Sequence, residues 1–426
     1  MGGRLRIGGR STRGAVSAAA AVAAVGLQAC HRWAPEMETW GTCTSVNISS
    51  CTSGARRILD APAGPPDLST ANGLLLGSCQ RGDAVGCVLL GQSYELGRGL
   101  PRSPEKSVQL YRRACEAGFV EGCNNLGTMF MEGLGCDRDP KRALILYRKA
   151  CDGGSPLGCY NLATSYVFGR GVSKDTKTAF DLLQRACRGG DLAGCNDLGA
   201  LLLVGDGVEK DEGQALLLFE QSCRSQNAHG CYLVGVMLEN GRGVVADPQR
   251  AAEMYRLACA NGDLEACTNL AVLLFEGRKV PRDVTAARKL LEAACSQAEP
   301  RACHDLAVLY ESETTLSGDD GRVASLFRQA CDGGEANACS NYGVMLFEGR
   351  GVPVDVAASI TALTRACDHG SPEGCANLGV LYASRNDAPR DPERARALLR
   401  RACDEGLKWA CPLAAEVDGA SLHLAP

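Results

Sequence analysis

The stretch CNNLGTMFMEGLGCDRDPKRALILYRKACDGGSPLG, residues 123–158, holds one full copy of a pattern that runs through the chain. Its first half places apolar and small residues at the spacing of one helix face: Cys123, Leu126, Gly127, Phe130 and Met131. Two glycines follow, and glycine is typical just past a helix end. An Asp-Pro pair then offers an N-cap and a first helical residue. A second apolar stripe comes after it: Ala143, Tyr147, Ala150 and Cys151. The stretch therefore predicts a hairpin of two helices, each of about twelve residues.

The same pattern returns every 36 residues. Eleven pairs of cysteines with seven residues between them begin at Cys43, Cys79, Cys115, Cys151, Cys187, Cys223, Cys259, Cys295, Cys331, Cys367 and Cys403. The pairs use 22 of the 24 cysteines and leave Cys30 and Cys136. Because no step contains an insertion or deletion, each block of 36 residues is expected to be one structural unit.

Small residues also recur at fixed places in the unit. One position holds Ala143, Ala179, Ala215, Ala251, Ala287 and Ala395, and another holds Gly91, Gly127, Gly199, Gly235, Gly343 and Gly379. Aromatic residues make up only 5% of the chain, so close approach of helix backbones must replace bulky cores. A single hairpin cannot bury its own apolar face, and the units are therefore expected to stack into an α/α solenoid.

The pattern C-x-N-L-G, G-x-G-V, D, A, Y and A-C over 36 residues resembles the Sel-one-like repeat (SLR) family. Within that family the chain is similar to the cysteine-rich subgroup typified by the Helicobacter cysteine-rich proteins. The resemblance covers roughly residues 68–411. It implies an all-α, TPR-like solenoid superhelix of about nine full repeats with partial caps at its ends.

Segments outside this region depart from the pattern. Residues 1–29 are interpreted as a signal peptide, 30–67 as a Pro/Gly/Ser/Thr-rich tether, and 412–426 as a C-terminal cap and tail. Inside the solenoid, the unit beginning at Cys303 replaces its G-x-G loop with ESETTLSGDDGR, which predicts a rearranged loop.

The first 29 residues have the features of an export signal. They contain four arginines and no acidic residue, followed by the apolar run AVSAAAAVAAVG, which is too short to span a bilayer. The ending LQAC resembles a bacterial lipobox, which implies lipidation of Cys30 and a lipoprotein of the periplasm or outer membrane. The alternative is a simple secretory signal, with Cys30 an ordinary cysteine. Either reading predicts an exported protein, and an organelle transit peptide is the third alternative.

The balance of charge bears on the kind of partner. The formal net charge is −4, and removing the four arginines of the signal leaves −8. No basic block remains, which argues against nucleic-acid binding.

Each cysteine pair joins the end of one hairpin to the start of the next. Because the two helices run antiparallel across a short turn, their cysteines can reach disulfide distance. Buried thiols conflict with export, zinc sites use closer spacings, and no C-x-x-C redox motif occurs. We therefore predict one disulfide per repeat: Cys79 with Cys87, Cys115 with Cys123, Cys151 with Cys159, Cys187 with Cys195, Cys223 with Cys231, Cys259 with Cys267, Cys295 with Cys303, Cys331 with Cys339, Cys367 with Cys375 and Cys403 with Cys411. Cys43 and Cys51 keep the register and form a further candidate pair.

No motif supports catalysis, a cofactor or a metal site. Members of the cysteine-rich subgroup are often named β-lactamases, and the resemblance implies β-lactam binding or hydrolysis as an alternative function. Ser103 and Lys106 form an S-x-x-K motif, but S-D-N and K-T-G are both absent. Ser103 also occupies the place at which Asp139 is expected to cap a helix in the next unit. A role as a helix cap is therefore preferred over catalysis.

The predicted function is that of a scaffold or adaptor at the cell envelope, which binds a protein or peptide and meets the membrane through its lipid anchor only. The first helices of the hairpins are expected to line the concave side of the solenoid. Two residues after the first-helix cysteine, Asn or Asp recurs as Asn125, Asn161, Asp197, Asn269, Asp305, Asn341 and Asn377. These side chains are either a ladder that hydrogen-bonds an extended peptide backbone or local bonds to the neighbouring turn.

Overall fold

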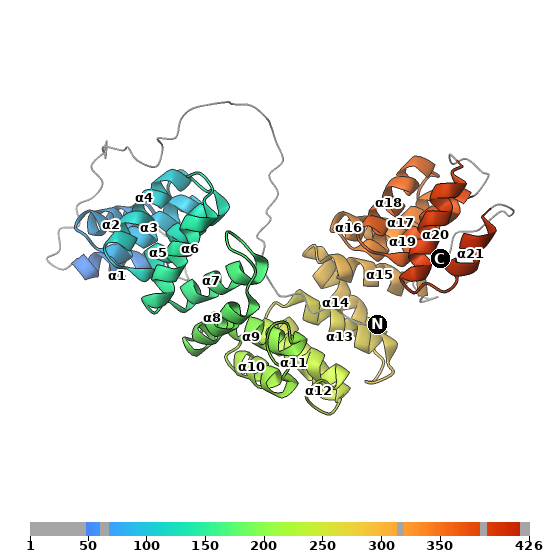
Figure 1. Cartoon of the computed structure of the whole chain (residues 1–426), viewed down its shortest axis with the longest axis horizontal. Coiled ribbons are helices and arrows are strands. Elements are labelled where there is room, and N and C mark those ends of the chain that lie inside the picture. The colour runs from blue at the N-terminus through green and yellow to red at the C-terminus, as the bar shows by residue number, and fades with distance from the viewer. Residues whose placement is uncertain (1–47, 60–67, 313–318, 384–389, 418–426) are drawn as a thin grey trace. The chain divides into compact units, whose positions relative to one another are not determined.

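The computed structural model describes residues 48–59, 68–312, 319–383 and 390–417, and every regular element in these ranges is a helix (Figure 1). The helices fall into two compact units, and the boundary in the sequence lies between Ser225 and Gln226. Unit 1 contains α1 (Ile48–Leu59), α2 (Leu68–Gln80), α3 (Ala84–Leu96), α4 (Pro104–Glu116), α5 (Val120–Glu132), α6 (Pro140–Asp152), α7 (Pro156–Phe168), α8 (Thr176–Arg188), α9 (Leu192–Val204) and α10 (Glu212–Arg224). Unit 2 contains α11 (Ala228–Asn240), α12 (Pro248–Ala260), α13 (Leu264–Glu276), α14 (Val284–Ser296), α15 (Pro300–Ser312), α16 (Asp320–Asp332), α17 (Ala336–Glu348), α18 (Val356–Asp368), α19 (Pro372–Ala383), α20 (Pro392–Asp404) and α21 (Ala410–Glu416).

Each repeat is a hairpin of an odd-numbered helix and the even-numbered helix that follows it. Within each unit every helix packs against its neighbours in sequence. Several successive odd-numbered helices also contact each other directly, as α5 does with both α3 and α7, and as α13 does with α15. The odd-numbered helices therefore form the more tightly curved inner layer of each unit. The predicted all-α solenoid with a 36-residue period is confirmed.

The core lies between the two layers, where small residues face large ones. A Cβ atom added at Gly127 would lie 2.7 Å from the ring of Tyr147, and one at Gly199 would lie 2.5 Å from the ring of Phe219. Repeat α7–α8 instead has an alanine at the glycine position, Ala163, and a leucine, Leu183, at the ring position. These glycines thus leave room for the bulky side chain of their own hairpin, which is a ring at Tyr147 and Phe219 and a leucine at Leu363 and Leu399.

The G-x-G loops need their glycines for two different reasons. Gly133 ends α5 in the left-handed conformation, with φ of 72°, and its N–H bonds the carbonyl of Met129. Gly171 also has a positive φ, and a Cβ atom there would lie 2.7 Å from Pro140 at the start of the preceding even-numbered helix. The first glycine therefore closes a helix, while the second lets the loop touch the previous repeat.

Disulfides close the turns between consecutive hairpins. Nine bonds join described cysteines that are eight positions apart, with Cα atoms 4.4 to 4.9 Å from each other: Cys79–Cys87, Cys115–Cys123, Cys151–Cys159, Cys187–Cys195, Cys259–Cys267, Cys295–Cys303, Cys331–Cys339, Cys367–Cys375 and Cys403–Cys411. Cys51, Cys223 and Cys231 are also disulfide-bonded. Cys136 keeps its thiol and packs half-buried against the core of unit 1. One disulfide per repeat is confirmed as part of the fold.

A polar side chain near the end of several even-numbered helices reaches back to the preceding repeat. Lys149 donates to the carbonyl oxygen of Cys115 at 3.1 Å, and Arg185 donates to that of Cys151 at 3.0 Å. Gln329 and Arg401 make the equivalent bonds to Cys295 and Cys367. These carbonyls are among the last of their helices and have no acceptor role within them. The bonds therefore cap one repeat with the next.

Aspartate caps begin the even-numbered helices with great regularity. The carboxylate of Asp139 accepts a hydrogen bond from the backbone N–H of Arg142, as predicted, and Asp175, Asp211, Asp247, Asp283, Asp319, Asp355 and Asp391 do the same in their helices. The odd-numbered helices use a more varied set at this place, which includes Asp191, Asn227 and Ser155.

Two of these caps are expected to respond to pH in opposite directions. Burial raises the pKa of the Asp191 carboxyl, whereas hydrogen bonds from the hydroxyl and N–H of Thr178 lower the pKa of the exposed Asp175. The contribution of the Asp191 carboxyl to the free energy of unfolding is therefore present at low pH and is lost as pH rises through its folded pKa. The Asp175 contribution is present above the unfolded pKa of 3.8 and is lost as pH falls through the lower folded pKa.

We expect Asp191→Asn to raise the midpoint of denaturant unfolding slightly at about pH 7.5, and Asp175→Asn to lower it, with both differences shrinking towards about pH 3. Asn retains the acceptor of the cap, as Asn227 already does with the N–H of Gly230 at 2.8 Å. Urea titrations of the two variants at both pH values measure the effect. Changes of the same sign in the two variants at pH 7.5 would contradict the opposite directions of the two pKa shifts.

The tether prediction for residues 30–67 is wrong for residues 48–59, which form α1. This helix packs against α2 even though it lacks the Leu-Gly pair of the other units. Its buried residues include Cys51 and Ala55, and Ala55 packs with Ala71 and Leu75 of α2. The helical array therefore starts before residue 68.

Other expectations lie outside the described residues. These are the signal peptide at 1–29, Cys30, Cys43, the rest of the tether, the loop at 313–318 and the tail from residue 418. At the C-terminal end, α21 packs against α20 as a short final helix.

Candidate functional site

The inner layer presents two residues from each odd-numbered helix, which we call the inner stripe. They stand two positions before and two positions after the helix cysteine, so they are one turn apart on one face. The first residue of each pair is exposed or half-buried in α3 to α19. The pairs are Val85 and Leu89, Glu121 and Asn125, Leu157 and Asn161, Ala193 and Asp197, His229 and Leu233, Glu265 and Asn269, Arg301 and Asp305, Asn337 and Asn341, and Glu373 and Asn377.

The seven predicted ladder residues all lie on this stripe, but their exposure differs. Asn125, Asn161, Asn269, Asp305 and Asn341 are half-buried, whereas Asp197 and Asn377 are buried. Leucine occupies the same place in α3 and α11. The structure thus brings the seven residues onto one layer, within two separate units, without making them a uniform row. Their binding of a peptide stays a prediction.

Some ladder residues bond the adjacent repeat. The Asn161 side-chain amide donates to Oδ1 of Asn124 at 2.8 Å, and that of Asn377 donates to the hydroxyl of Ser340 at 3.3 Å. In both cases the acceptor follows the cysteine of the preceding odd-numbered helix. Such bonds fix the rotamers of the amides, and they also explain why Asn is kept inside a helix despite its low propensity.

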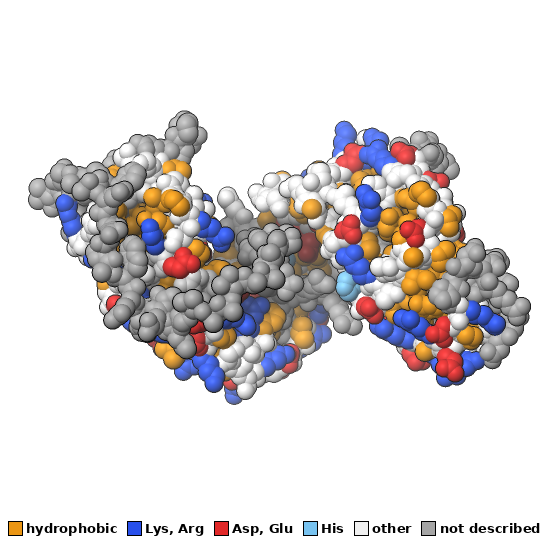
Figure 2. All heavy atoms as spheres, turned by 90° about the horizontal axis from the view of Figure 1, so that it is seen from above, with side chains coloured by type: hydrophobic (Ala, Val, Ile, Leu, Met, Phe, Trp, Pro, Cys, Tyr) orange, Lys and Arg blue, Asp and Glu red, His pale blue; other side chains and the backbone are white. Residues whose placement is uncertain are grey.

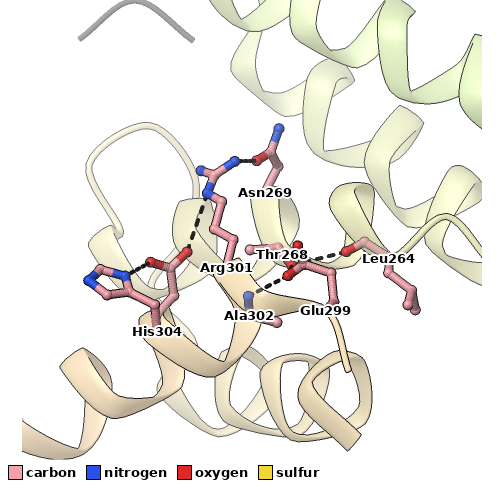
Figure 3. Close-up of polar contacts among 8 residues, drawn as sticks. Leu264, Thr268, Asn269, Glu299, Arg301, Ala302 and His304 are labelled. Carbon is pink, nitrogen blue, oxygen red and sulfur yellow. Dashed lines mark hydrogen bonds and ion pairs between the residues drawn. The ribbon is translucent and has the colours of Figure 1, made fainter. Parts of the chain in front are cut away.

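The densest polar network of the stripe lies between α13 and α15 (Figure 3). The Arg301 guanidinium donates to Oδ1 of Asn269 at 2.9 Å, and its Nε lies 3.6 Å from Oδ2 of Asp305. The other oxygen of Asp305 lies 3.0 Å from Nδ1 of His304. Arginine, aspartate and asparagine from two successive repeats are therefore held in one chain of contacts, with the Arg301 side chain 49% exposed.

A second, more buried group lies beside this network. Glu299 accepts hydrogen bonds from the N–H of Ala302 and from the hydroxyl of Thr268, which itself also bonds the carbonyl of Leu264 (Figure 3). Burial raises the pKa of the Glu299 carboxyl, while these hydrogen bonds oppose the shift. Glu299 is thus an N-cap that ties α15 to α13, and it supports the position of Arg301 two residues later.

The neighbouring step of the stripe combines a histidine with aromatic rings. Nδ1 of His229 lies 3.4 Å from the Asp263 carboxylate, and its ring stacks on Tyr232 with centroids 5.5 Å apart. The hydroxyl of Tyr232 also bonds Glu265. Unit 2 therefore carries a continuous polar and aromatic surface on α11, α13 and α15.

Sequence reasoning found the ladder position but missed the residues around it. The histidines fall at scattered places in the unit, which gave no reason to connect His304 or His229 with the stripe. An alignment of the nine inner-stripe pairs would have shown that Arg301 alone is an arginine or lysine at its place. The contact between Arg301 and Asn269 crosses repeats, so only the packing of α13 on α15 reveals it.

The motif at Ser103 has an ordinary structural setting. Ser103 is the N-cap residue of α4, as expected, but its hydroxyl donates to the Glu105 carboxylate at 3.0 Å rather than to the backbone. The Lys106 ammonium lies over the ring of Tyr94, 4.9 Å from its centroid. The two residues of the motif thus make separate contacts, and this geometry lends no support to a β-lactam site.

Charge is mixed on the described surface. On the face in view, basic and acidic side chains alternate between patches of hydrophobic ones (Figure 2). Arg350 of a G-R-G loop, for example, lies 2.7 Å from the Glu311 carboxylate of the preceding repeat. Within the described ranges, no group of three or more His, Cys, Asp or Glu residues could hold a metal ion, and no helix is long and apolar enough to cross a membrane.

The repeats of this chain match a known repeat family. The model of the Sel1 repeat matches residues 84–119, 120–155, 156–191, 192–227, 228–263, 264–299, 336–371 and 372–407, which is more than half of the chain. No curated protein sequence gives a significant match.

Several solved structures of bacterial proteins are similar to this one. A protective antigen of uropathogenic Escherichia coli strains that displays an SLR fold is 21% identical, with a TM-score of 0.52 over 87% of this chain and 88% of that one. A Sel1 repeat protein from Oxalobacter formigenes is 23% identical, with a TM-score of 0.51 over 57% of this chain and 96% of that one. Cysteine rich protein B of Helicobacter pylori is 30% identical over 30% of this chain and 93% of that one, with a TM-score of 0.26. Eight matched repeats, the disulfides between consecutive hairpins and the solenoid itself agree: the chain belongs to the Sel1 repeat family.

Proposed function

We propose that this protein is an exported adaptor of the cell envelope that holds an extended segment of a partner protein along its inner stripe. The observation that carries the proposal is the pairing of residues on the odd-numbered helices. Each repeat offers two side chains at the same two positions of its odd-numbered helix. Bonds such as that of Asn161 to Asn124 hold some of these side chains in one rotamer. Prearranged polar groups lose little entropy when they bind a ligand.

The polar side chains of the stripe suit an extended peptide. The side-chain amide of Asn both donates and accepts hydrogen bonds, and the carboxylate of Asp is a strong acceptor. Such groups can pair with the backbone N–H and C=O of a peptide of any sequence. Repeat proteins present extended surfaces of this kind along their curved face. The inner layer repeats the same geometry in every hairpin, and this repetition supports a scaffold role.

Envelope placement rests on the sulfur chemistry and the N-terminal sequence. Structural disulfides persist in oxidising compartments, and nine of them join described cysteines here. We further propose cleavage before Cys30, lipidation of that residue, and a tether that ends where α1 begins. Labelling with a radioactive fatty acid, compared between the wild type and Cys30→Ala, tests this part; equal incorporation would contradict it.

Peptide binding is tested on the inner stripe itself. A randomised library of extended peptides is selected on the purified, oxidised protein, and the affinities of the selected peptides are measured for two double variants, Asn125→Ala with Asn161→Ala and Asn269→Ala with Asn341→Ala. Because two hydrogen bonds are lost, at least one of these variants is expected to bind about 10-fold more weakly.

The matched control lies on the outer layer. Ile145 and Leu217 are 69% and 64% exposed on even-numbered helices, and their replacement by Ala should leave binding unchanged. Equal affinity of both inner-stripe variants and the wild type would refute the ladder. Loss of binding only in the outer-layer variant would move the site to the even-numbered helices.

A further inference from the structure

Arg301 is the one arginine or lysine at its inner-stripe position in the described helices α3 to α19. The equivalent residues are Val85, Glu121, Leu157, Ala193, His229, Glu265, Asn337 and Glu373. It lies in the block 300–335, which the Sel1 repeat model does not match although both neighbouring blocks are matched. The repeat that departs most from the family pattern therefore carries the most distinctive side chain of the stripe.

The guanidinium of Arg301 is held from two repeats. Asn269 on α13 accepts from one terminal nitrogen at 2.9 Å, and Asp305, one turn along α15, faces Nε at 3.6 Å. These contacts engage two positions of a fork that has five N–H donors, and the side chain is 49% exposed. Donors thus remain on a group whose orientation is set by the two contacts that Figure 3 draws.

Asp305, which faces Arg301, and Glu265 also contact other side chains. One oxygen of Asp305 is engaged by His304 at 3.0 Å. Glu265, on the same face of α13 as Asn269, accepts from the hydroxyl of Tyr232. These carboxylates lower the net positive charge of the site, but they do not occupy all the N–H donors of the Arg301 guanidinium.

We propose that Arg301 binds the side-chain carboxylate of an acidic residue within the extended segment that occupies unit 2. This inference rests on the proposed function. A planar guanidinium matches the two oxygens of a carboxylate. One cation beside Asp305 suits a ligand with a single negative charge better than a phosphate, which attracts several cations. The carboxylate belongs to an internal residue, because α15 is the middle one of the odd-numbered helices α11 to α19 and stripe residues continue on both sides.

The test uses two peptide libraries of defined chemistry. Both are randomised, acetylated at the N-terminus and amidated at the C-terminus, and they differ only in a fixed central residue, Glu in one and Gln in the other. Fluorescence anisotropy with the full, oxidised protein should give about 10-fold tighter binding of the Glu library, since a hydrogen bond to a charged group replaces a neutral one. Added salt should reduce this preference.

The variants assign the preference to one side chain. Arg301→Gln should bind both libraries equally and at the level of the wild type with the Gln library, while Arg301→Lys should keep part of the preference. Arg278→Gln, which changes an exposed loop arginine in the same unit, should retain all of it. Circular dichroism melts confirm that each variant is folded.

The outcomes separate the two proposals. Equal binding of both libraries by the wild type overturns the role of Arg301 and leaves peptide binding in place. A third library, with Gln at the centre and a free C-terminus, overturns the choice of an internal side chain if it binds more tightly than the amidated Gln library. Absence of binding to every library overturns the proposed function together with this inference.

Discussion

Gly199→Ala is expected to destabilise unit 1 by about 2 kcal/mol, because the new methyl group has no space. Its carbon would lie 2.5 Å from Cε1 of Phe219, a ring that is fully buried between the two layers. α9 is held on its other side by its contacts with α8. Alanine has a higher helix propensity than glycine by about 1 kcal/mol, so the measured loss is smaller than the steric cost alone. Urea unfolding followed by circular dichroism measures it.

A second substitution should recover part of this loss. Phe219→Leu together with Gly199→Ala recreates the combination found at Ala163 and Leu183, and we expect the double variant to regain about 1 kcal/mol relative to Gly199→Ala. The control is Ala163→Gly, which removes helix propensity without any clash and should cost about 1 kcal/mol. If Gly199→Ala unfolds at the same urea concentration as the wild type, the packing argument fails.

Removing one disulfide should cost about 2.5 kcal/mol, since the bond closes a loop of about nine residues in the unfolded chain. The pair Cys187 and Cys195 is suited to this test because both residues are buried and alanine leaves no polar group in the core. The double variant Cys187→Ala with Cys195→Ala should therefore unfold at a clearly lower denaturant concentration under oxidising conditions. Its control is Cys136→Ala, which removes a half-buried thiol and no disulfide.

Two results would contradict this prediction. Equal midpoints for the double variant and the wild type would show that the bridge does not stabilise the native state. Peptide mapping of the non-reduced protein should also recover cysteines linked eight positions apart, and links between distant repeats would be incompatible with the structure.

Local features of the fold could be predicted from sequence because they act within one hairpin or across one turn. The apolar stripes, the cap at Asp139, the glycine opposite Tyr147 and the disulfide of Cys115 with Cys123 all join residues that are at most about one hairpin apart. The exception is α1, which lacks the Leu-Gly pair of the other units but forms a helix that packs against α2.

For the candidate site, the sequence predicted which position of the repeat is involved, but not the contacts that its side chains make. The sequence identified the recurrence of Asn125, Asn161 and their equivalents, but it left open whether they bind a partner or their own neighbours. The bond from Asn161 to Asn124 and the contact of Arg301 with Asn269 join residues 37 and 32 positions apart, in successive repeats. Those pairings depend on the rise and rotation from one repeat to the next.

The sequence by itself determined the repeating unit of this protein, its two helices, its sulfur bridges and the small residues that let the helices meet. Only the tertiary structure decided which side chains touch across repeats, from the bond of Arg185 to the carbonyl of Cys151 to the setting of Arg301. The physical reason is that periodicity and capping are encoded by neighbouring residues, whereas the register between stacked hairpins is set by the combined packing of all of them.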